Sequence, residues 1–165
     1  DFTANVSGGN TPATVYWMND DDRLYFAVRV MQASVGSKNS VRLDIDNDGD
    51  GVAEAFDDII GYDVDLQSAI DQYLTARCAN NNQSGCGRDD RSADVVGAVS
   101  NDGVYTTYEL SQHLAGDARG EDLAAAAGDQ IGFFLTLRVG NGAQGNTQVP
   151  GFRSYQPLTI VGLGN

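Results

Sequence analysis

The stretch Ile131-Gly132-Phe133-Phe134-Leu135-Thr136-Leu137-Arg138-Val139 decides the class of fold. Large apolar side chains occupy every second position from Ile131 to Val139, whereas Thr136 and Arg138 fall between them. In an extended chain, a repeat of two residues places alternate side chains on opposite faces. The stretch therefore predicts a β-strand with one face in a hydrophobic core.

The same alternation recurs along the chain in segments that are bounded by Gly, Asn or Asp. About eight or nine short strands with turn residues between them are typical of an antiparallel sandwich. The sequence therefore predicts an all-β fold, a jelly-roll-like antiparallel β-sandwich in a single domain, 1–165. The expected strands are 13–18, 23–31, 41–46, 58–65, 93–99, 104–110, 131–139 and 158–163.

One short helix is expected around 66–77. Leu66, Ile70 and Leu74 recur at a spacing of four residues, and Asp65 is a suitable N-cap. A second, Ala-rich segment at 121–127 also favours a helix, but it is too short to be stable alone.

The charge of the chain excludes several classes of function. Its 165 residues carry 23 acidic and ten basic side chains, for a formal net charge of −13. Such a surface argues against binding to nucleic acid or to an anionic membrane, because both need a basic face. No apolar run is long enough to span a bilayer, so no membrane insertion is expected. Acidic turns with almost no Lys also favour a halophilic or marine source, where salt screens the repulsion.

Cys78 and Cys86 flank a polar stretch that is rich in Asn. A disulfide that closes this loop is the favoured interpretation, and it indicates an extracellular, secreted or cell-surface protein, with the periplasm as an alternative. Two free thiols or half of a zinc site are weaker alternatives, because the chain has no other Cys and His113 is its only His.

The segment Asp46-Asn47-Asp48-Gly49-Asp50-Gly51-Val52-Ala53-Glu54-Ala55-Phe56-Asp57 has the residue spacing of a calcium loop. Carboxylates at its first, third, fifth, ninth and twelfth positions can converge on one hard cation, and the glycine at the sixth position permits the sharp turn. The alternative is a solvated acidic turn with no ion. The predicted Ca²⁺ ligands are Asp46, Asp48, Asp50, the Val52 carbonyl, Glu54 and Asp57.

The flanks of this loop distinguish it from an EF-hand, because strands and not helices are expected on both sides. In its spacing the loop resembles those of thrombospondin type 3 repeats and dockerins. The acidic side chains fill the coordination sphere, and no His or open position indicates catalysis, so a structural role is expected.

Three further segments resemble family 9 carbohydrate-binding modules and the wider group of DOMON-like sandwiches. They are an acidic turn with the strand after it at 20–28, the strand at 103–110, and the segment 128–133. The resemblance implies a jelly-roll-like sandwich that often serves as an extracellular accessory domain. Some members bind sugar and others bind haem.

The resemblance also implies candidate ligand-binding residues. The sugar-binding members hold a sugar between two tryptophans, but this chain has only Trp17. Phe152 and Tyr155 can supply the second face of such a slot, because any aromatic ring can stack on a sugar. A core position is the favoured interpretation of Trp17 itself, because it lies on a short alternating strand. For haem, Met18, Met31 and His113 supply the types of axial ligand.

No nucleophile motif, triad spacing or Walker loop is present, so the chain is not expected to be an enzyme. The sequence predicts an extracellular, calcium-stabilised binding or accessory module, with carbohydrate as the favoured partner. It would be a monomer or part of a larger multidomain protein. The alternatives are a structural or interaction domain of a cell-surface protein, and a haem-binding electron-transfer domain.

Overall fold

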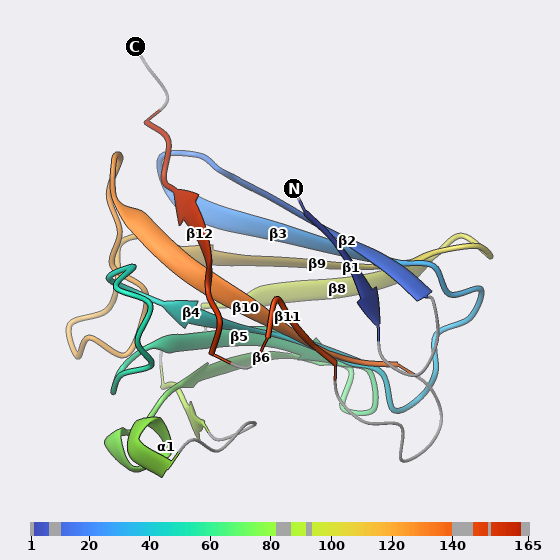
Figure 1. The fold of residues 1–165 in the computed structure, drawn as a ribbon, viewed down its shortest axis with the longest axis horizontal. Helices are drawn as coiled ribbons and strands as arrows, with labels where there is room; N and C mark the ends of the chain where they lie inside the picture. The colour runs from blue at the N-terminus through green and yellow to red at the C-terminus, as the bar shows by residue number, and fades with distance from the viewer. Residues whose placement is uncertain are drawn as a thin grey trace.

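The computed structural model describes residues 2–6, 11–81, 87–91, 94–139, 147–151 and 153–162. Within these ranges, two antiparallel sheets face each other and one short helix lies beside them (Figure 1). One sheet has the order β1-β2-β3-β9-β8; the other has the order β11-β10-β4-β5-β6-β7, with β12 also paired to β10. The predicted antiparallel β-sandwich is confirmed.

The described residues hold more strands than the sequence predicted, because several are too short to show a period of two. Strand β7, for example, has two residues and β11 has three. The elements are β1 (Phe2–Val6), β2 (Thr11–Asn19), β3 (Arg23–Val30), β4 (Ser40–Asp46), β5 (Asp58–Asp63), β6 (Ser68–Tyr73), α1 (Ala76–Asn81), β7 (Arg88–Asp89), β8 (Val96–Asn101), β9 (Thr106–His113), β10 (Gln130–Arg138), β11 (Thr147–Val149) and β12 (Gln156–Thr159).

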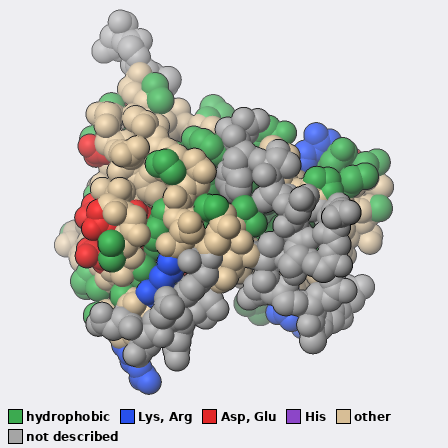
Figure 2. All heavy atoms as spheres, viewed as in Figure 1, with side chains coloured by type: hydrophobic (Ala, Val, Ile, Leu, Met, Phe, Trp, Pro, Cys, Tyr) green, Lys and Arg blue, Asp and Glu red, His purple; other side chains and the backbone are tan. Residues whose placement is uncertain are grey.

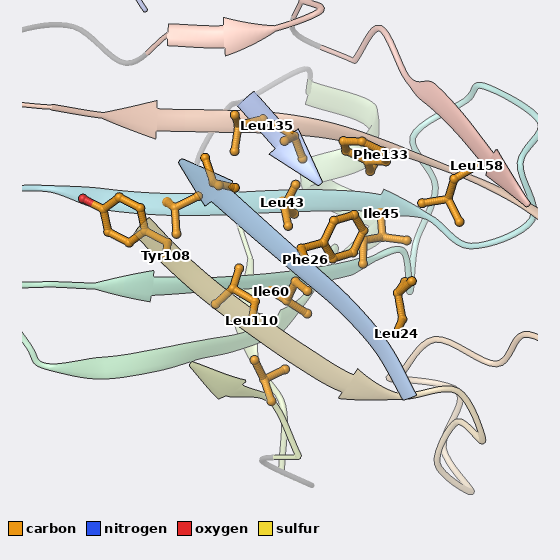
Figure 3. Packing of buried hydrophobic residues seen from close by; sticks show 14 of the residues in the cluster. Leu24, Phe26, Leu43, Ile45, Ile60, Tyr108, Leu110, Phe133, Leu135 and Leu158 are labelled. Atoms are coloured by element: carbon orange, nitrogen blue, oxygen red, sulfur yellow. The ribbon is translucent and has the colours of Figure 1, made fainter. Parts of the chain in front are cut away.

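The hydrophobic core fills the space between the two sheets. Figure 3 shows side chains of β3, β9, β4 and β10 meeting there, among them Phe26, Tyr108, Leu43 and Phe133. All four are buried, and each large apolar side chain of this kind stabilises the fold by about 1.5–3 kcal/mol. The alternation read from the sequence is therefore the alternation between core and surface.

Strand β10 is the stretch that predicted the fold, and it is buried on both faces. Phe133, Leu135 and Leu137 point into the core. Phe134 points to the other side and is also buried, with its ring centroid 5.3 Å from that of Tyr155. Because Tyr155 covers the outer side of the strand, an apolar residue, Phe134, is favoured there although it faces away from the core.

The helix expected around 66–77 lies later in the chain, at α1. In its place, the chain turns after β5 and forms β6, which pairs with β5. The Asp63 carboxylate accepts hydrogen bonds from the N–H groups of Asp65 and Leu66 at 2.8 and 3.1 Å, which stabilises the turn. A spacing of four residues fits two periods of a strand as well as one helical turn, so the pattern was ambiguous. The segment 121–127 is not helical either; Ala124 forms a bridge with Ala115.

The loop between β4 and β5 rests directly on the first residue of β10. Gly49 and Gly51 have φ values of 69° and 83°, which L side chains disfavour. A Cβ on Gly49 would lie 2.3 Å from the Gln130 carbonyl oxygen, whereas a Cβ on Gly51 would meet no atom within 4 Å. Of these two glycines, Gly49 is the one that the close contact with β10 requires.

Within the described residues, no helix has the length and apolar character that crossing a bilayer requires.

We expect Leu135→Ala to lower the free energy of unfolding by about 2–5 kcal/mol, because Leu135 is 0% exposed in the core. Leu66→Ala is the matched control, since Leu66 is 72% exposed and its loss should stay within about 0.5 kcal/mol. Urea denaturation followed by tryptophan fluorescence measures both. A large loss in Leu66→Ala would contradict the turn and support the helix instead.

We expect Gly49→Ala to destabilise the protein more than Gly51→Ala. Both substitutions place a side chain at positive φ, which costs about 1–2 kcal/mol. Gly49→Ala must also displace the backbone of β10, which adds about 1–3 kcal/mol. Equal losses in thermal denaturation of the two variants would show that the loop does not rest on Gln130.

Candidate functional site

The acidic loop begins at Asp46, the last residue of β4, which is buried (1% exposed). Its two carboxylate oxygens accept hydrogen bonds from the N–H groups of Gly49 and Gly51 at 2.9 and 2.8 Å. One carboxylate oxygen each from Asp46, Asp48 and Asp50 lies within 4.8 Å of the other two. The structure therefore brings together the first three predicted calcium ligands.

The remaining predicted ligands hold different positions. The Asp57 carboxylate is buried and accepts hydrogen bonds from the N–H groups of Glu54 at 2.7 Å and Asn47 at 3.4 Å. Burial raises the pKa of Asp57 to about 7; these two hydrogen bonds lower it, and the charges of Asp46 and Asp48 raise it. Glu54 and Val52 are exposed.

Burial of the acidic loop is incomplete, which leaves it open to ions from solvent. Figure 2 shows Asp and Glu side chains gathered at the end of the molecule where the loop between β4 and β5 lies. Burial also raises the pKa of Asp46, whereas the hydrogen bonds from Gly51 and Gly49 lower it. Such carboxylates favour either a proton or a bound cation.

A groove of about 400 Å³ crosses the outer face of β2, β3 and β9. Strand register places Tyr16, Met18, Tyr25, Ala27 and Glu109 on this outer face, because Met18 lies opposite Tyr25, and Ala27 lies opposite both Tyr16 and Glu109. The other strand residues of the lining, Trp17, Phe26 and Leu110, alternate with them and pack in or against the core. Met18 is 66% exposed and Tyr16 is 41% exposed. The residues that line the groove are Tyr16, Trp17, Met18, Asp20, Tyr25, Phe26, Ala27, Glu109 and Leu110.

Polar groups fix the side chains at one end of this groove. The Tyr25 hydroxyl donates a hydrogen bond of 2.8 Å to Asp20 Oδ2. The other Asp20 oxygen accepts from the N–H groups of Asp22 and Arg23 at 2.9 and 2.7 Å. These hydrogen bonds lower the pKa of Asp20, and the bond to Asp20 raises the pKa of Tyr25. Asp20 is thus held ionised beside an aromatic ring.

The structure does not bring Trp17 and Tyr155 together. The Trp17 ring lies edge-on to Phe133, with ring centroids 5.5 Å apart, and packs against the core. Tyr155 contacts Phe134 in the same edge-on manner. Phe133 and Phe134 point to opposite faces of β10, so Trp17 and Tyr155 lie on opposite sides of that strand. Phe152 lies outside the described residues.

The candidate haem ligands are also separated. Register pairs His113 with Arg23 at the first residue of β3, whereas Met31 follows the last residue of that strand. His113 Nδ1 lies 3.2 Å from Asp22 Oδ2, and its Nε2 lies 2.6 Å from Arg23 Nη1. Both ring nitrogens of His113 therefore already have polar neighbours. Met18 lies in the groove.

The predicted disulfide falls only partly within the described residues. Cys78 is buried in α1 beside Leu74 and Ile59, and Cys86 lies outside the described ranges. The pairing of the two cysteines stays a prediction.

Sequence reasoning about sugar binding reached this groove only at Trp17, which lines it, although a further signal was present. Tyr16, Met18 and Tyr25 occupy the surface positions of alternating strands, where polar side chains are expected. Several apolar or aromatic side chains on a solvent-facing row are a mark of a binding surface.

The sequence matches no protein-family model and no curated protein. Solved structures that it resembles include those of a family 9 carbohydrate-binding module from Caldicellulosiruptor kristjanssonii. The complex with glucose has a TM-score of 0.65 at 11% identity, over 98% of this chain and 85% of that one. The complex with cellotriose has a TM-score of 0.66 at 11% identity, over 99% of this chain and 82% of that one. The chain therefore has the β-sandwich fold of family 9 carbohydrate-binding modules.

Proposed function

We propose that this chain is a non-catalytic, calcium-stabilised module that acts outside the cytosol and binds carbohydrate in the groove on the outer face of β2, β3 and β9. One observation carries the proposal: the groove combines the rings of Tyr16 and Tyr25 with the carboxylates of Asp20 and Glu109. Its volume of about 400 Å³ falls within the range of small-ligand sites.

The chemistry of a sugar fits this set of side chains. A pyranose ring has an apolar C–H face that stacks on an aromatic ring, and hydroxyl groups around its edge that donate hydrogen bonds. Tyr16 and Tyr25 can supply the stacking surface, while Asp20 and Glu109 can accept from hydroxyls. The likeness to a module in complex with glucose and with cellotriose supports the same class of ligand.

The charge of the groove favours neutral sugars over acidic ones. Its lining includes two carboxylates and neither Lys nor Arg. The two arginines on the outer face of β3 have other partners: Arg29 lies over the Tyr105 ring, and Arg23 donates to Ser111. A polyuronate would meet like charge and find no cation, which costs binding energy.

The acidic loop supports the calcium part of the proposal. Ca²⁺ takes six to eight oxygen ligands, and three carboxylate oxygens already converge there. Asp57, beside this triad, is the next candidate. A cation would relieve the repulsion among these carboxylates and would fix the loop against β10.

We expect the protein to be retarded by hydroxyethylcellulose or another neutral β-glucan in native affinity electrophoresis, and not by polygalacturonate. Tyr25→Ala should weaken retardation about tenfold, because one stacking contact is worth about 0.5–1.5 kcal/mol beyond its buried area. Tyr105→Ala is the matched control, since Arg29 lies over the Tyr105 ring and Tyr105 does not line the groove. Equal retardation of both variants would exclude the groove as the binding site. Failure of every neutral glycan to bind would exclude the function.

We expect removal of calcium to lower the melting temperature. Excess chelator should shift the thermal denaturation curve of the wild type downward, and Asp50→Asn should reduce that shift because it removes one ligand of the loop. Asp21→Asn, an exposed aspartate outside the loop, is the control and should behave as the wild type. Identical melting curves of the wild type in calcium and in chelator would contradict a structural ion.

A further inference from the structure

A second group of carboxylates lies away from the 46–57 loop. One carboxylate oxygen each from Asp71 on β6, Asp90 after β7 and Asp122 between β9 and β10 lies within 4.8 Å of the other two. Asp90 also forms such a group with Asp117 and Glu121. The segment between β9 and β10 therefore contributes three acidic side chains to one place at the edge of the larger sheet.

Two carboxylate oxygens of these residues are buried and accept no hydrogen bond. Asp71 Oδ2 accepts from the Val95 N–H at 3.1 Å, but Asp71 Oδ1 is buried and accepts none. Glu121 Oε2 is also buried and accepts no hydrogen bond, but it forms a long ion pair with Arg119 Nη1 at 3.9 Å. A buried acceptor with no partner costs about 1–3 kcal/mol, so Asp71 Oδ1 indicates a missing partner in this group.

Gln112 is an independent observation beside Asp71: because β8 pairs Val96 with Ser111, Gln112 lies next to Val95, whose N–H donates to Asp71 Oδ2. It is 1% exposed, and neither its amide oxygen nor its amide nitrogen has a hydrogen-bond partner. Like Tyr108 and Leu110 on the same strand, it points between the sheets, where β9 faces β5. Asp58, at the start of β5, is buried and lies on the same face of that strand as the core residue Ile60. Gln112 is thus a buried side chain with unpaired polar atoms on the inner face next to Asp71.

The surroundings of these carboxylates are negative. Asp58 is 2% exposed and accepts hydrogen bonds from the N–H groups of Ile59 and Leu123. The charges of Asp71 and Asp122 repel the Asp58 carboxylate. The charges of Asp94 and Asp90 repel the Asp71 carboxylate in the same way. A divalent cation among them would offset this repulsion.

We propose that Asp71, Asp90 and Asp122 form a second divalent-cation site, separate from the 46–57 loop, with Asp117 and Glu121 at its rim. Calcium fits the site better than transition metals, because all the donors are oxygens and neither His nor Cys is among them. The ion would tie the long connection between β9 and β10 to strands β6 and β7.

The stoichiometry of bound calcium tests the proposal. We expect equilibrium dialysis with elemental analysis of the wild-type protein to find one ion for the loop and one for the second site. Asp71→Asn and Glu121→Gln should each lose one ion, and Asp50→Asn should lose the other. Asp21→Asn is the control for a change of charge at the surface. Circular dichroism verifies that each variant is folded. If Asp71→Asn does not fold, Glu121→Gln alone tests the second site.

The outcomes separate this site from the loop. A wild type that binds a single ion, lost in Asp50→Asn and kept in Glu121→Gln, would overturn the second site and leave the loop in place. A single ion that is lost in Glu121→Gln and kept in Asp50→Asn would confirm the second site and count against the loop. Calcium counts in Asp71→Asn and Glu121→Gln equal to that of the wild type would also overturn the proposal.

Discussion

The contact of Phe133 with Trp17 and Phe26 joins the two sheets, and the rest of the structure depends on it. The Phe133 ring centroid lies 5.5 Å from that of Trp17 and 5.2 Å from that of Phe26, edge-on in both cases. Phe133 belongs to β10, whereas Trp17 and Phe26 are paired residues of β2 and β3. Because β10 also pairs with β4, β11 and β12, this contact fixes the larger sheet against the smaller one.

The sequence predicted those strands whose alternating burial can be read from their own residues. In β3, β4, β9 and β10, every second side chain is buried, so apolar and polar residues alternate along each strand. The segment around Leu66 was different, because a spacing of four residues satisfies a helix and a strand equally. Pairing with β5, which only the tertiary structure reveals, decides between them.

The candidate sites also differ in whether their residues are close in sequence or are brought together by the fold. Asp46, Asp48 and Asp50 are close in sequence, so their convergence followed from spacing alone. The groove takes side chains from β2, β3 and β9, and the second acidic group combines β6 with the connection after β9; topology brings each set together. Trp17 and Tyr155 were expected to share a slot, but the face of β10 that each one contacts separates them.

The alternation along β2 and β3 has a consequence for how such a protein can diverge. Residues that face the groove and residues that face the core succeed one another on the same strands, so Tyr16 lies beside Val15, and Tyr25 lies beside Leu24. Exchanges in the outer row change the surface that meets a ligand and leave the inner row intact. Substitutions of Tyr16 or Tyr25 can therefore alter the groove without a change in the core, whereas Trp17, Phe26 and Leu110 line the groove and also pack in or against the core, so a change at any of them affects both.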